Sequence, residues 1–317
     1  MKLGIMGTGK IVQEVLPLIA SLHPEKCYLM GRETSAARTR DLCQKYRLNG
    51  YFLNAEDLLA ADIDTVYLAL PNSLHFPFAK QAIAAGKHVI VEKPATVHSQ
   101  ELLELAADAE AQQVFLLEAM SLHYTPAFRS LKEQLPSLSP IRLVNFQFCQ
   151  YSSRYDDFRE GKIAPAFDPA CMGGALMDLN VYNLHAILAL FGKPQDAHYF
   201  PNMQRGVDTS GVAALDYGTF QAVSLAAKDC QAPVASTIQG ENACLTVRMP
   251  MNQIDRYEIS DHKGQTQVFD FHNEKHRLYH EFTELERIIR EKDTKTAQEL
   301  LRVSIDVVTL LEQLRPY

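Results

Sequence analysis

The sequence lacks the features by which several large classes of protein are recognised. It has no cluster of lysines and arginines, and its formal net charge is −7. Because phosphate backbones are bound by clustered basic side chains, we expect no nucleic-acid partner. No apolar run reaches the roughly 18 residues that a membrane-spanning helix needs, so we expect no membrane partner. Residues 2–6 already form a strand-like run, and we therefore expect no secretory signal.

Paired cysteines are also missing. The six cysteines are scattered, and none belongs to a C-x-x-C pair. Without a secretory signal, scattered cysteines favour reduced thiols in the cytoplasm and argue against a disulfide scaffold. The sequence also shows no internal repeat and no low-complexity segment. Its 317 residues, 47% of them apolar and 22% charged, suit a soluble globular protein of two domains.

The first 120 residues alternate between short apolar runs and helical patterns. Because the runs are continuously apolar, both faces of each strand are expected to be covered, as in a parallel sheet between layers of helices. This pattern predicts a doubly wound α/β domain over residues 1–120. The expected strands are Lys2–Met6, Cys27–Met30, Tyr51–Leu53, Thr65–Leu70, His88–Val91 and Val114–Leu117. The expected helices are Lys10–Ser21, with a kink or an early end at Pro17, Ser35–Tyr46, Phe76–Ala85 and Ser99–Ala111.

The pattern of apolar and polar residues changes after about residue 120. Several later runs alternate between apolar and polar residues, which is typical of an antiparallel sheet with one covered face. The pattern predicts an α+β domain over residues 121–317 with a large, mostly antiparallel mixed sheet. The expected strands are Leu143–Tyr151, Val207–Tyr217, Thr219–Ala227, Val234–Ile238, Ala243–Arg248, Arg256–Ser260 and Thr266–Phe271. The expected helices are Gly174–Phe191, Lys275–Glu291 and Lys295–Leu314.

Residues 4–12 predict a nucleotide-binding turn between the first strand and the first helix. The glycines of a G-x-G pair let the backbone turn tightly and approach a pyrophosphate, and the helix amino terminus offers unpaired N–H groups to that anion. Val12 stands where a glycine or alanine is usual, so the match is imperfect, and a glycine-rich turn without a ligand is the alternative. The expected dinucleotide-binding residues are Gly7, Thr8, Gly9, Lys10 and Ile11.

The tip of the second strand bears on the choice between NADP and NAD. Gly31 is followed by Arg32, and a small residue followed by arginine accommodates the 2′-phosphate of NADP. Arg38 could assist, or it is a solvated helix residue. Glu33 lies slightly later than the acid that holds the ribose of NAD, although it could still serve that cofactor. We expect NADP to be preferred, with NAD as the alternative.

A strand end near residue 70 places polar groups where open α/β sheets bind their ligands. Leu70, Pro71 and Asn72 form the turn, and His75 follows at the start of a helix. These groups would face the nicotinamide side of the crevice. Alternatively, Asn72 caps a turn and His75 is an ordinary helix-terminus histidine.

The tripeptide Glu92-Lys93-Pro94 closes another apolar run. Lysines seldom end a buried strand unless they are paired or functional, and Pro94 biases Lys93 away from helix. In a partly dry crevice a lysine loses its proton more readily, which suits proton exchange with a substrate hydroxyl. The alternative is a surface lysine in a loop.

A third candidate lies on the predicted helix Gly174–Phe191. Asp178, Tyr182 and His185 are spaced so that they would share one helical face. A polar stripe on an otherwise apolar helix needs partners or a wet cleft. The stripe is therefore a candidate substrate site, with a buried structural network as the alternative.

Three histidines, His272, His276 and His280, are spaced to share a helical face. Such spacing invites a metal site, but no carboxylate base accompanies them as in H-E-x-x-H. We therefore expect a solvated helix face and no metal.

Together these segments resemble the Gfo/Idh/MocA family of NAD(P)-dependent oxidoreductases, essentially from end to end. The resemblance implies a Rossmann domain followed by a mixed-sheet domain whose open face often makes dimer contacts, so we expect a homodimer or a higher homo-oligomer. It also implies that Lys93 is the catalytic lysine and that Pro94 lies beside the nicotinamide. The segments that carry it are Gly7–Gly9, Ala69–His75, Ala85–Pro94 and Gly173–His185. The cofactor-binding residues expected beyond the glycine turn are Arg32, Leu70, Pro71, Asn72, His75, Glu92, Lys93 and Pro94.

The resemblance extends to substrate-binding positions. Members that act on inositol-like polyols carry a histidine where this chain has Tyr182, which resembles the glucose–fructose oxidoreductase, aldose dehydrogenase and dihydrodiol dehydrogenase branch. Asn180 replaces a common glycine, so the pocket floor is expected to differ. Arg154 lies where such proteins approach substrate and could bind a polyhydroxyl compound or an acid, or form a structural ion pair. Arg154, Asn180 and His185 are the candidate substrate residues.

The resulting hypothesis is hydride transfer between NADP(H) and a hydroxyl-bearing small molecule, such as a sugar or a cyclic diol. Tyr182 would exchange the hydroxyl proton with electrostatic help from Lys93, and Asp178 would orient the substrate. Tyr182 and Lys93 could also swap these roles. A non-catalytic sensor that binds a dinucleotide on the same fold is the alternative, and the presence of all three residues argues against it.

Overall fold

The computed structural model describes residues 1–316, which divide into two compact units. The N-terminal unit comprises Met1–Ala119 and Lys275–Ile305. The C-terminal unit comprises Met120–Glu274 and the described residues from Asp306 onward. The first break lies beside the predicted boundary at residue 120. The segment Lys275–Ile305, which the sequence assigned to the second domain, packs with the first unit.

The N-terminal unit is built on six parallel strands in the order β3-β2-β1-β4-β5-β6. This is the doubly wound order, in which the sheet direction reverses between β1 and β4, and ligands bind beyond the carboxyl ends of the strands at that point. The predicted α/β class is confirmed. The strands are Lys2–Met6 (β1), Lys26–Met30 (β2), Gly50–Phe52 (β3), Thr65–Leu68 (β4), His88–Glu92 (β5) and Leu116–Ala119 (β6).

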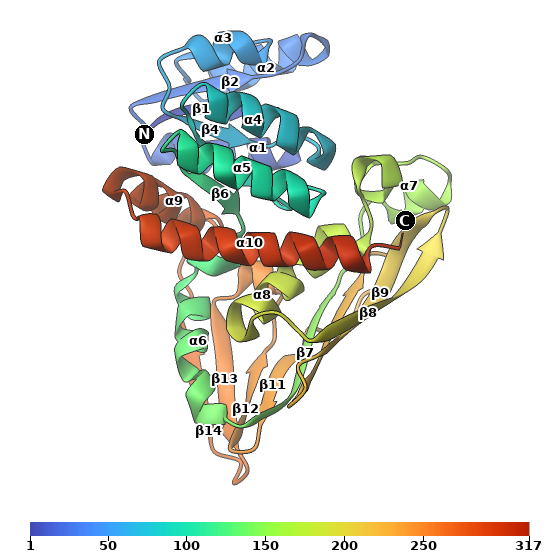
Figure 1. Ribbon diagram of the computed structural model, residues 1–317. Coiled ribbons are helices and arrows are strands. Elements are labelled where there is room, and N and C mark those ends of the chain that lie inside the picture. Colours follow the sequence, from blue (N-terminus) through green and yellow to red (C-terminus); the bar gives the residue numbers. More distant parts are fainter. Residues whose placement is uncertain (317) are drawn as a thin grey trace. The chain divides into compact units, whose positions relative to one another are not determined.

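Helices flank this sheet, and α4 and α5 lie side by side in Figure 1. Helix α1 continues past Pro17 to Ser21, so the expected early end there is wrong. Pro17 is exposed, while its neighbours Leu16 and Leu18 are buried, and their burial offsets the lost backbone donor. The helices are α1 (Lys10–Ser21), α2 (Ala36–Lys45), α3 (Ala55–Ala60), α4 (His75–Ala84), α5 (Ser99–Ala111), α9 (Tyr279–Glu291) and α10 (Thr294–Leu314), whose last residues belong to the C-terminal unit.

The central strands of the N-terminal unit are buried, as continuously apolar strands should be. All four residues of β4 are buried. Tyr67 of this strand packs edge-on against Phe282 of α9, with ring centroids 5.3 Å apart. Helix α9 therefore contributes to the core that packs against β4, although α9 and β4 are more than 200 residues apart in the sequence.

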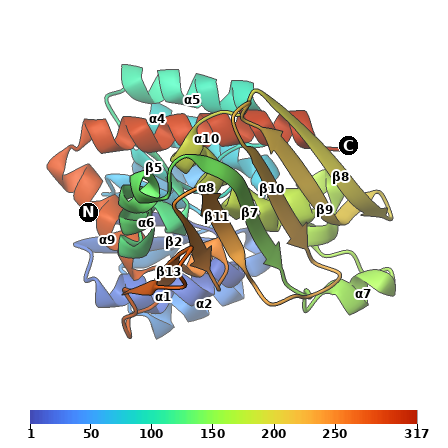
Figure 2. The same ribbon diagram turned by 90° about the horizontal axis from the view of Figure 1, so that it is seen from below.

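The C-terminal unit contains one sheet of eight strands in the order β14-β13-β12-β11-β7-β10-β9-β8, part of which is seen in Figure 2. Only β7 and β10 pair in parallel, and every other neighbouring pair is antiparallel. The predicted mixed, mostly antiparallel sheet is confirmed. Its strands are Ile141–Cys149 (β7), Asp196–Gln204 (β8), Val207–Asp216 (β9), Gln221–Ala227 (β10), Ser236–Gly240 (β11), Ala243–Val247 (β12), Arg256–Asp261 (β13) and Thr266–Asp270 (β14).

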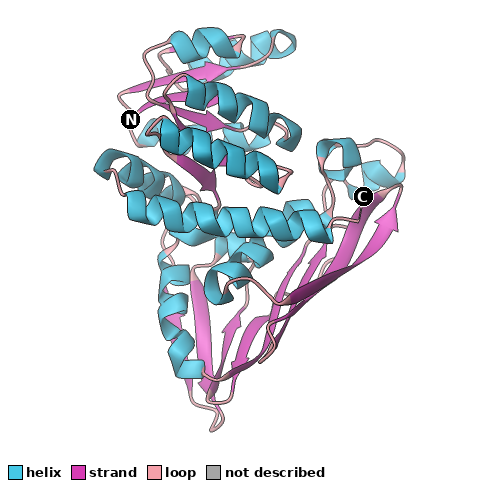
Figure 3. Ribbon diagram, viewed as in Figure 1, coloured by secondary structure: helices cyan, strands magenta, loops and turns pink. Residues whose placement is uncertain are grey.

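Helices cover one face of this sheet, as Figure 3 shows by colour. Along β7, Val144 and Phe146 are buried, while Leu143 on the other face is 50% exposed. The helices of the unit are α6 (Pro126–Leu138), α7 (Tyr155–Arg159) and α8 (Val181–Phe191), and a π-helical turn, Leu176–Asn180, precedes α8. Short 3₁₀ helices in the two units span Glu33–Ser35, Asn72–Leu74, Ser121–Tyr124, Pro165–Phe167, Pro169–Cys171 and Met251–Gln253.

One segment, Pro169–Phe191, is long and apolar enough to cross a membrane by composition alone. Polar residues such as Asp178 and Asn180 interrupt this segment, so it contains no continuous apolar run. In the structure 67% of its most apolar stretch is buried, including Val181, Leu184 and Ile187. These buried side chains make it a core segment of the C-terminal unit.

Candidate active site

The turn after β1 has the backbone that the two glycines predict. Gly7 has φ +125°, and its N–H donates to the carbonyl of Met30 at 2.9 Å. A Cβ at Gly7 would overlap the carbonyl oxygen of Ala69, whereas a Cβ at Gly9 would meet no atom within 4 Å. Gly9 is the N-cap residue of α1. No side chain caps this helix, and its first turn contains no acidic residue. The helix terminus is thus open to an anion, which its N–H groups attract.

The other predicted residues of this turn differ in exposure. Thr8 is buried, Lys10 is exposed and Ile11 is half-buried. Lys10 adds a positive charge at the helix terminus. Val12 is fully buried and so belongs to the packing of α1.

The carboxyl end of β2 explains why a glycine precedes Arg32. A Cβ at Gly31 would clash with the side chain of Thr39, so the strand can pass close to α2 only with a glycine there. The N–H of Arg32 bonds the Ser35 hydroxyl at 3.0 Å, and its side chain is exposed. Arg32 is therefore a cation at the edge of the sheet that carries the glycine turn.

The turn after β4 and the loop after β5 are joined by one histidine. The ring nitrogens of His75 lie 2.9 Å from the carbonyl oxygens of Leu70 and Pro94. His75 is completely buried, and burial lowers its pKa, although the hydrogen bonds to the two carbonyls oppose this shift. The sequence suggested a cofactor contact for His75, but its observed partners are the two loops that it connects.

Lys93 and Pro94 directly follow β5, and a second buried side chain fixes their loop. The N–H of Ala95 donates to the Glu118 carboxylate at 2.8 Å, and Glu118 is 6% exposed. Sequence analysis missed Glu118, although a charged residue in an otherwise apolar strand was the available signal. The backbone beside Lys93 is thus held from β6 and from α4.

The carboxylate before Lys93, that of the half-buried Glu92, interacts with a second, buried acid, Glu281. The Tyr67 hydroxyl donates to Glu92 at 2.5 Å. Glu281 of α9 is 2% exposed, and burial, together with the nearby charge of Glu92, raises its pKa well above the ordinary value. Burial raises the pKa of Glu92 as well. Arg277, which bonds Glu14 at 2.6 Å, opposes both shifts without cancelling them.

Replacing Glu281 with glutamine should flatten the pH dependence of stability. The folded chain retains a proton on Glu281 that the unfolded chain releases near its ordinary value of 4.5. The free energy of unfolding therefore falls as pH rises from that value through the higher folded pKa. Thermal midpoints at about pH 5 and about pH 8 measure this loss, which Glu281→Gln should reduce. Glu286→Gln on the same helix is the control, and parallel curves for wild type and Glu281→Gln would contradict the assignment.

The C-terminal unit positions Asp178 on the π-helical turn Leu176–Asn180. The N–H of Leu176 at its start donates to the buried carboxylate of Asp208 at 2.7 Å. Asp178 accepts a hydrogen bond from the ammonium of Lys228 at 2.8 Å, and its side chain is 37% exposed. Sequence analysis missed Lys228, because neither its spacing nor its neighbours linked it to residue 178. π-Helical turns are frequent at functional sites.

The three residues of the predicted stripe, Asp178, Tyr182 and His185, differ in burial and in partners. Asp178 is partly exposed, whereas His185 is fully buried, with its Nδ1 atom 3.0 Å from Nε2 of His123. Asp178 lies on the π-helical turn, whereas Tyr182 and His185 lie on α8, so their angular spacing differs from that of one continuous α-helix. Tyr182 is half-buried, and its ring lies 6.0 Å from that of Phe148.

Asn180 faces the sheet. It is fully buried and is bonded by the Ser224 hydroxyl and, at 3.2 Å, by the Asn183 amide. Arg154 differs, because its side chain is exposed at the start of α7. Among the candidate substrate residues, Asn180 and His185 therefore lie in buried networks, and Arg154 is accessible.

The structure brings the predicted residues of each unit together separately. Gly7, Asn72 and Lys93 follow β1, β4 and β5, which are adjacent in the sheet, so these residues lie along one edge. Asp178 and Tyr182 lie in the C-terminal unit, on consecutive turns.

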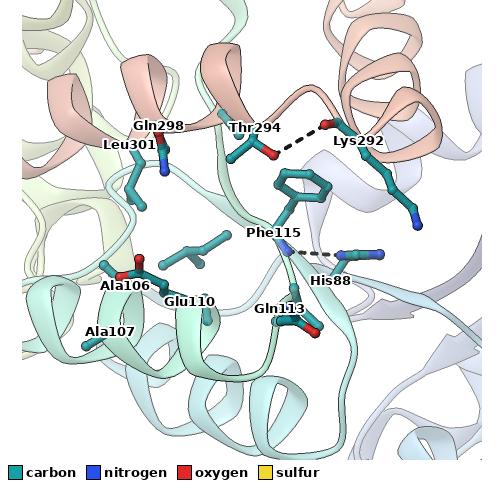
Figure 4. Close-up of a pocket in the computed structure, with 14 residues that line it drawn as sticks. His88, Ala106, Ala107, Glu110, Gln113, Phe115, Lys292, Thr294, Gln298 and Leu301 are labelled. Atoms are coloured by element: carbon teal, nitrogen blue, oxygen red, sulfur yellow. Dashed lines mark hydrogen bonds between the residues drawn. The ribbon is translucent and has the colours of Figure 1, made fainter.

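A cavity of about 730 Å³ lies at the opposite, amino-terminal edge of the parallel sheet. Figure 4 shows His88 and Phe115 at its wall, where the Phe115 N–H donates to the His88 ring at 2.9 Å. Glu110 of α5 and Gln298 of α10 also line it. Because it lies at the amino ends of β5 and β6, this cavity is distinct from the edge that carries Lys93.

The three histidines considered as metal ligands do not share a helix. Helix α9 begins at Tyr279, after His272 and His276, so the predicted helical face is wrong. His272 instead lies 2.9 Å from the carboxylate of Asp255, which raises its pKa. Among the described residues, no group of three or more potential ligands could hold a metal ion.

Comparison with known proteins identifies the family. The family described as "Oxidoreductase family, NAD-binding Rossmann fold" matches residues 1–120. The scyllo-inositol 2-dehydrogenase (NADP(+)) IolU of Bacillus subtilis is 30% identical over 317 residues, which cover 99% of this chain and 96% of that protein. The chain belongs to the Gfo/Idh/MocA family. It is therefore an NAD(P)-dependent oxidoreductase that acts on hydroxyl or carbonyl groups, as predicted.

Two further known proteins have lower sequence identity to this chain. The trans-1,2-dihydrobenzene-1,2-diol dehydrogenase of Mus musculus is 27% identical over 221 residues, covering 68% of this chain and 64% of that protein. The crystal structure of a 3-ketoreductase from Actinomadura kijaniata, in complex with NADP and TDP-benzene, superposes with a TM-score of 0.83. The superposed region covers 99% of this chain and 97% of the 3-ketoreductase, with 19% sequence identity. This similarity supports a shared fold.

Proposed function

We propose that this member of the Gfo/Idh/MocA family is an NADP(H)-dependent dehydrogenase or reductase of a sugar or a cyclic polyol. The observation that carries the proposal is the lysine directly after β5, on the sheet edge where the glycine turn of β1 also lies. A relative named as an NADP(+)-dependent inositol dehydrogenase, matching almost the whole chain, supports the cofactor and the substrate class.

The residues of the N-terminal unit fit a dinucleotide. Open space at Gly9 and the uncapped start of α1 leave N–H groups for a pyrophosphate. The exposed Arg32, directly after Gly31, suits the 2′-phosphate of NADP. Leu70, Pro71 and Asn72 lie at the carboxyl end of β4 and suit the nicotinamide half. The side chains of His75 and Glu118 hold the loop of Lys93 through hydrogen bonds to the backbone of Pro94 and Ala95.

The nicotinamide, when bound, would supply or accept the hydride. We assign the proton to Tyr182, which exchanges it with the substrate hydroxyl, and electrostatic support to Lys93. Lys93 and Tyr182 could exchange these two roles. Asp178 accepts hydrogen bonds from neighbouring substrate hydroxyls, and the exposed Arg154 adds a donor.

Steady-state absorbance at the reduced-nicotinamide band tests the function directly. Purified protein is mixed with NADP⁺ and a panel of inositols, aldoses and cyclic diols, and with NADPH and the matching ketones. Turnover with at least one polyol supports the proposal. Tight NADPH binding without turnover across the panel would favour a sensor and overturn it.

Replacing Arg32 with alanine should shift the cofactor preference. Loss of a guanidinium that binds a phosphate weakens NADPH binding by about tenfold or more, while NADH binding stays within about twofold. Fluorescence titration of both cofactors measures the two changes. The control is Arg40→Ala, which removes an exposed arginine on α2. Equal losses for NADPH and NADH would contradict recognition of the 2′-phosphate.

We also propose a cytoplasmic homodimer. Its interface would be the uncovered face of the eight-stranded sheet, where Leu143 on β7 and Phe200 on β8 are 50% and 65% exposed. Exposed large apolar side chains on one sheet face mark interaction surfaces. Light scattering of the purified protein at micromolar concentration gives the mass, and a monomer would contradict this part of the proposal.

A further inference from the structure

A second lysine, Lys228, lies in the interior of the C-terminal unit. It directly follows β10, and its N–H donates to the carbonyl of Thr209 at 2.8 Å. Its own carbonyl accepts from the N–H of Ser152 at 2.9 Å. The side chain is only 2% exposed. Since burying an ammonium without compensation costs several kcal/mol or more, its partners must explain its presence.

The ammonium of Lys228 contacts groups from two separate segments. It donates to the Asp178 carboxylate at 2.8 Å and to the Ala166 carbonyl at 2.5 Å. It also lies 4.4 Å from the centroid of the Phe167 ring. Asp178 belongs to the π-helical turn, and the other two belong to the 3₁₀ helix Pro165–Phe167. Lys228 therefore ties these two segments together through one charged atom.

Aromatic rings pack around the Lys228 end of this contact. Phe167 is fully buried and stacks on Phe158 at a centroid distance of 4.8 Å. Tyr155 packs against both rings. In such surroundings the attraction between ammonium and carboxylate is stronger than at a solvated surface, and the ammonium also gains from the ring face.

The two ends of the ion pair differ in accessibility. Lys228 is 2% exposed, whereas the Asp178 side chain is 37% exposed. The charge of the carboxylate is thus balanced from the protein interior while the carboxylate itself remains accessible. A carboxylate held in this way accepts hydrogen bonds from hydroxyl groups, and the pair as a whole is neutral, which suits an uncharged polyol.

We propose that Lys228 is a positioning residue that orients the Asp178 carboxylate toward substrate hydroxyls. The proposal rests on the proposed function, in which Asp178 binds the substrate. It adds the residue that follows β10 to the substrate site and predicts that the affinity for the polyol depends on a side chain that does not touch the polyol.

The test uses the full-length protein with the polyol identified in the turnover assay and three variants, Lys228→Met, Asp178→Asn and the double variant. Lys228→Met and Asp178→Asn should each raise the KM for the polyol by about tenfold or more. The double variant should be no worse than the poorer single variant, because both remove one interaction. The dissociation constant of NADPH should stay within about twofold of wild type in all three.

Two further variants separate positioning from general stability. Lys228→Arg keeps the charge and should recover part of the lost affinity. Lys193→Met removes another lysine of the same unit, which pairs with Asp306 at 2.8 Å but is 63% exposed, and should leave KM and kcat unchanged. A purely structural role for Lys228 predicts less active protein with an unchanged KM, and this result would overturn the proposal.

The outcomes also separate this proposal from the function on which it rests. Wild-type kinetics for Asp178→Asn would remove Asp178 from the substrate site and overturn the proposed role of that residue. An impaired Asp178→Asn beside a Lys228→Met of wild-type KM would overturn positioning alone. If Lys228→Met does not fold, the double variant, which lacks both charges, is compared with Asp178→Asn. A further rise in KM there would then contradict the proposal.

Discussion

Lys93→Met should reduce turnover of the polyol by about 10²–10⁴-fold, because a positioned proton-transfer or charge-stabilising group contributes that much to a hydride-transfer reaction. Methionine is apolar and of similar length, so the loop after β5 should persist. Its backbone is held by His75 at the carbonyl of Pro94 and by Glu118 at the N–H of Ala95. The dissociation constant of NADPH is therefore expected to stay within about threefold of wild type.

Steady-state kinetics and fluorescence titration of NADPH measure the two quantities separately. Lys87→Met is the matched control, since Lys87 lies just before the other end of β5, and its ammonium donates to the carbonyl of Ile63 at 2.8 Å. This control should keep full turnover. Unchanged turnover in Lys93→Met would end the assignment of Lys93 as a catalytic residue.

The second large effect is expected in the glycine turn. Alanine in place of Gly7 should lower the stability of the fold, whereas alanine in place of Gly9 should weaken cofactor binding. Gly7 has φ +125°, and an added Cβ would overlap the Ala69 carbonyl. Gly7→Ala should therefore destabilise the N-terminal unit by about 2–5 kcal/mol, from backbone strain and overpacking together. Gly9 has φ −70° and open space around its Cβ position, so Gly9→Ala should change stability by less than about 0.5 kcal/mol.

Affinity for the cofactor should distinguish Gly9 further. Its added methyl group would occupy space through which the backbone approaches a pyrophosphate, and NADPH binding should weaken by about tenfold or more. Urea unfolding and NADPH titration of both variants give the comparison. A Gly9→Ala variant with wild-type NADPH affinity would remove the turn from the proposed cofactor site, and a fully stable Gly7→Ala would contradict the strain argument.

The sequence predicted the sheets well, because each has a clear periodicity. The buried parallel strands are continuously apolar, and the later strands alternate, as in β9 and β7. Four strands or α-helices escaped prediction, of which α3 and α7 are short helices of six and five residues. Strand β8 contains Pro201 and lies at the edge of its sheet, where a proline is tolerated. Helix α6 begins at Pro126 after a Thr125 cap, but Pro136 within its last turn obscured the pattern.

The candidate site was predictable where its residues follow strand ends, as Gly7, Asn72 and Lys93 do. The site was not predictable where a residue gains its role from burial against residues that are distant in the sequence. Glu281 and Lys228 lie far in the sequence from the residues that they contact, so no local pattern could reveal them. The π-helical turn at Leu176–Asn180, which carries Asp178, was also not predictable, because nothing in the sequence indicated it.

The return of Lys275–Ile305 to the N-terminal unit has a consequence for synthesis on the ribosome. While only the first 120 residues have emerged, Tyr67 lacks Phe282, and Glu92 lacks Glu281 and Arg277. Domains otherwise tend to fold in the order in which they are made. Here the core of the nascent sheet closes only after Lys275–Ile305 has been synthesised, long after the strands themselves.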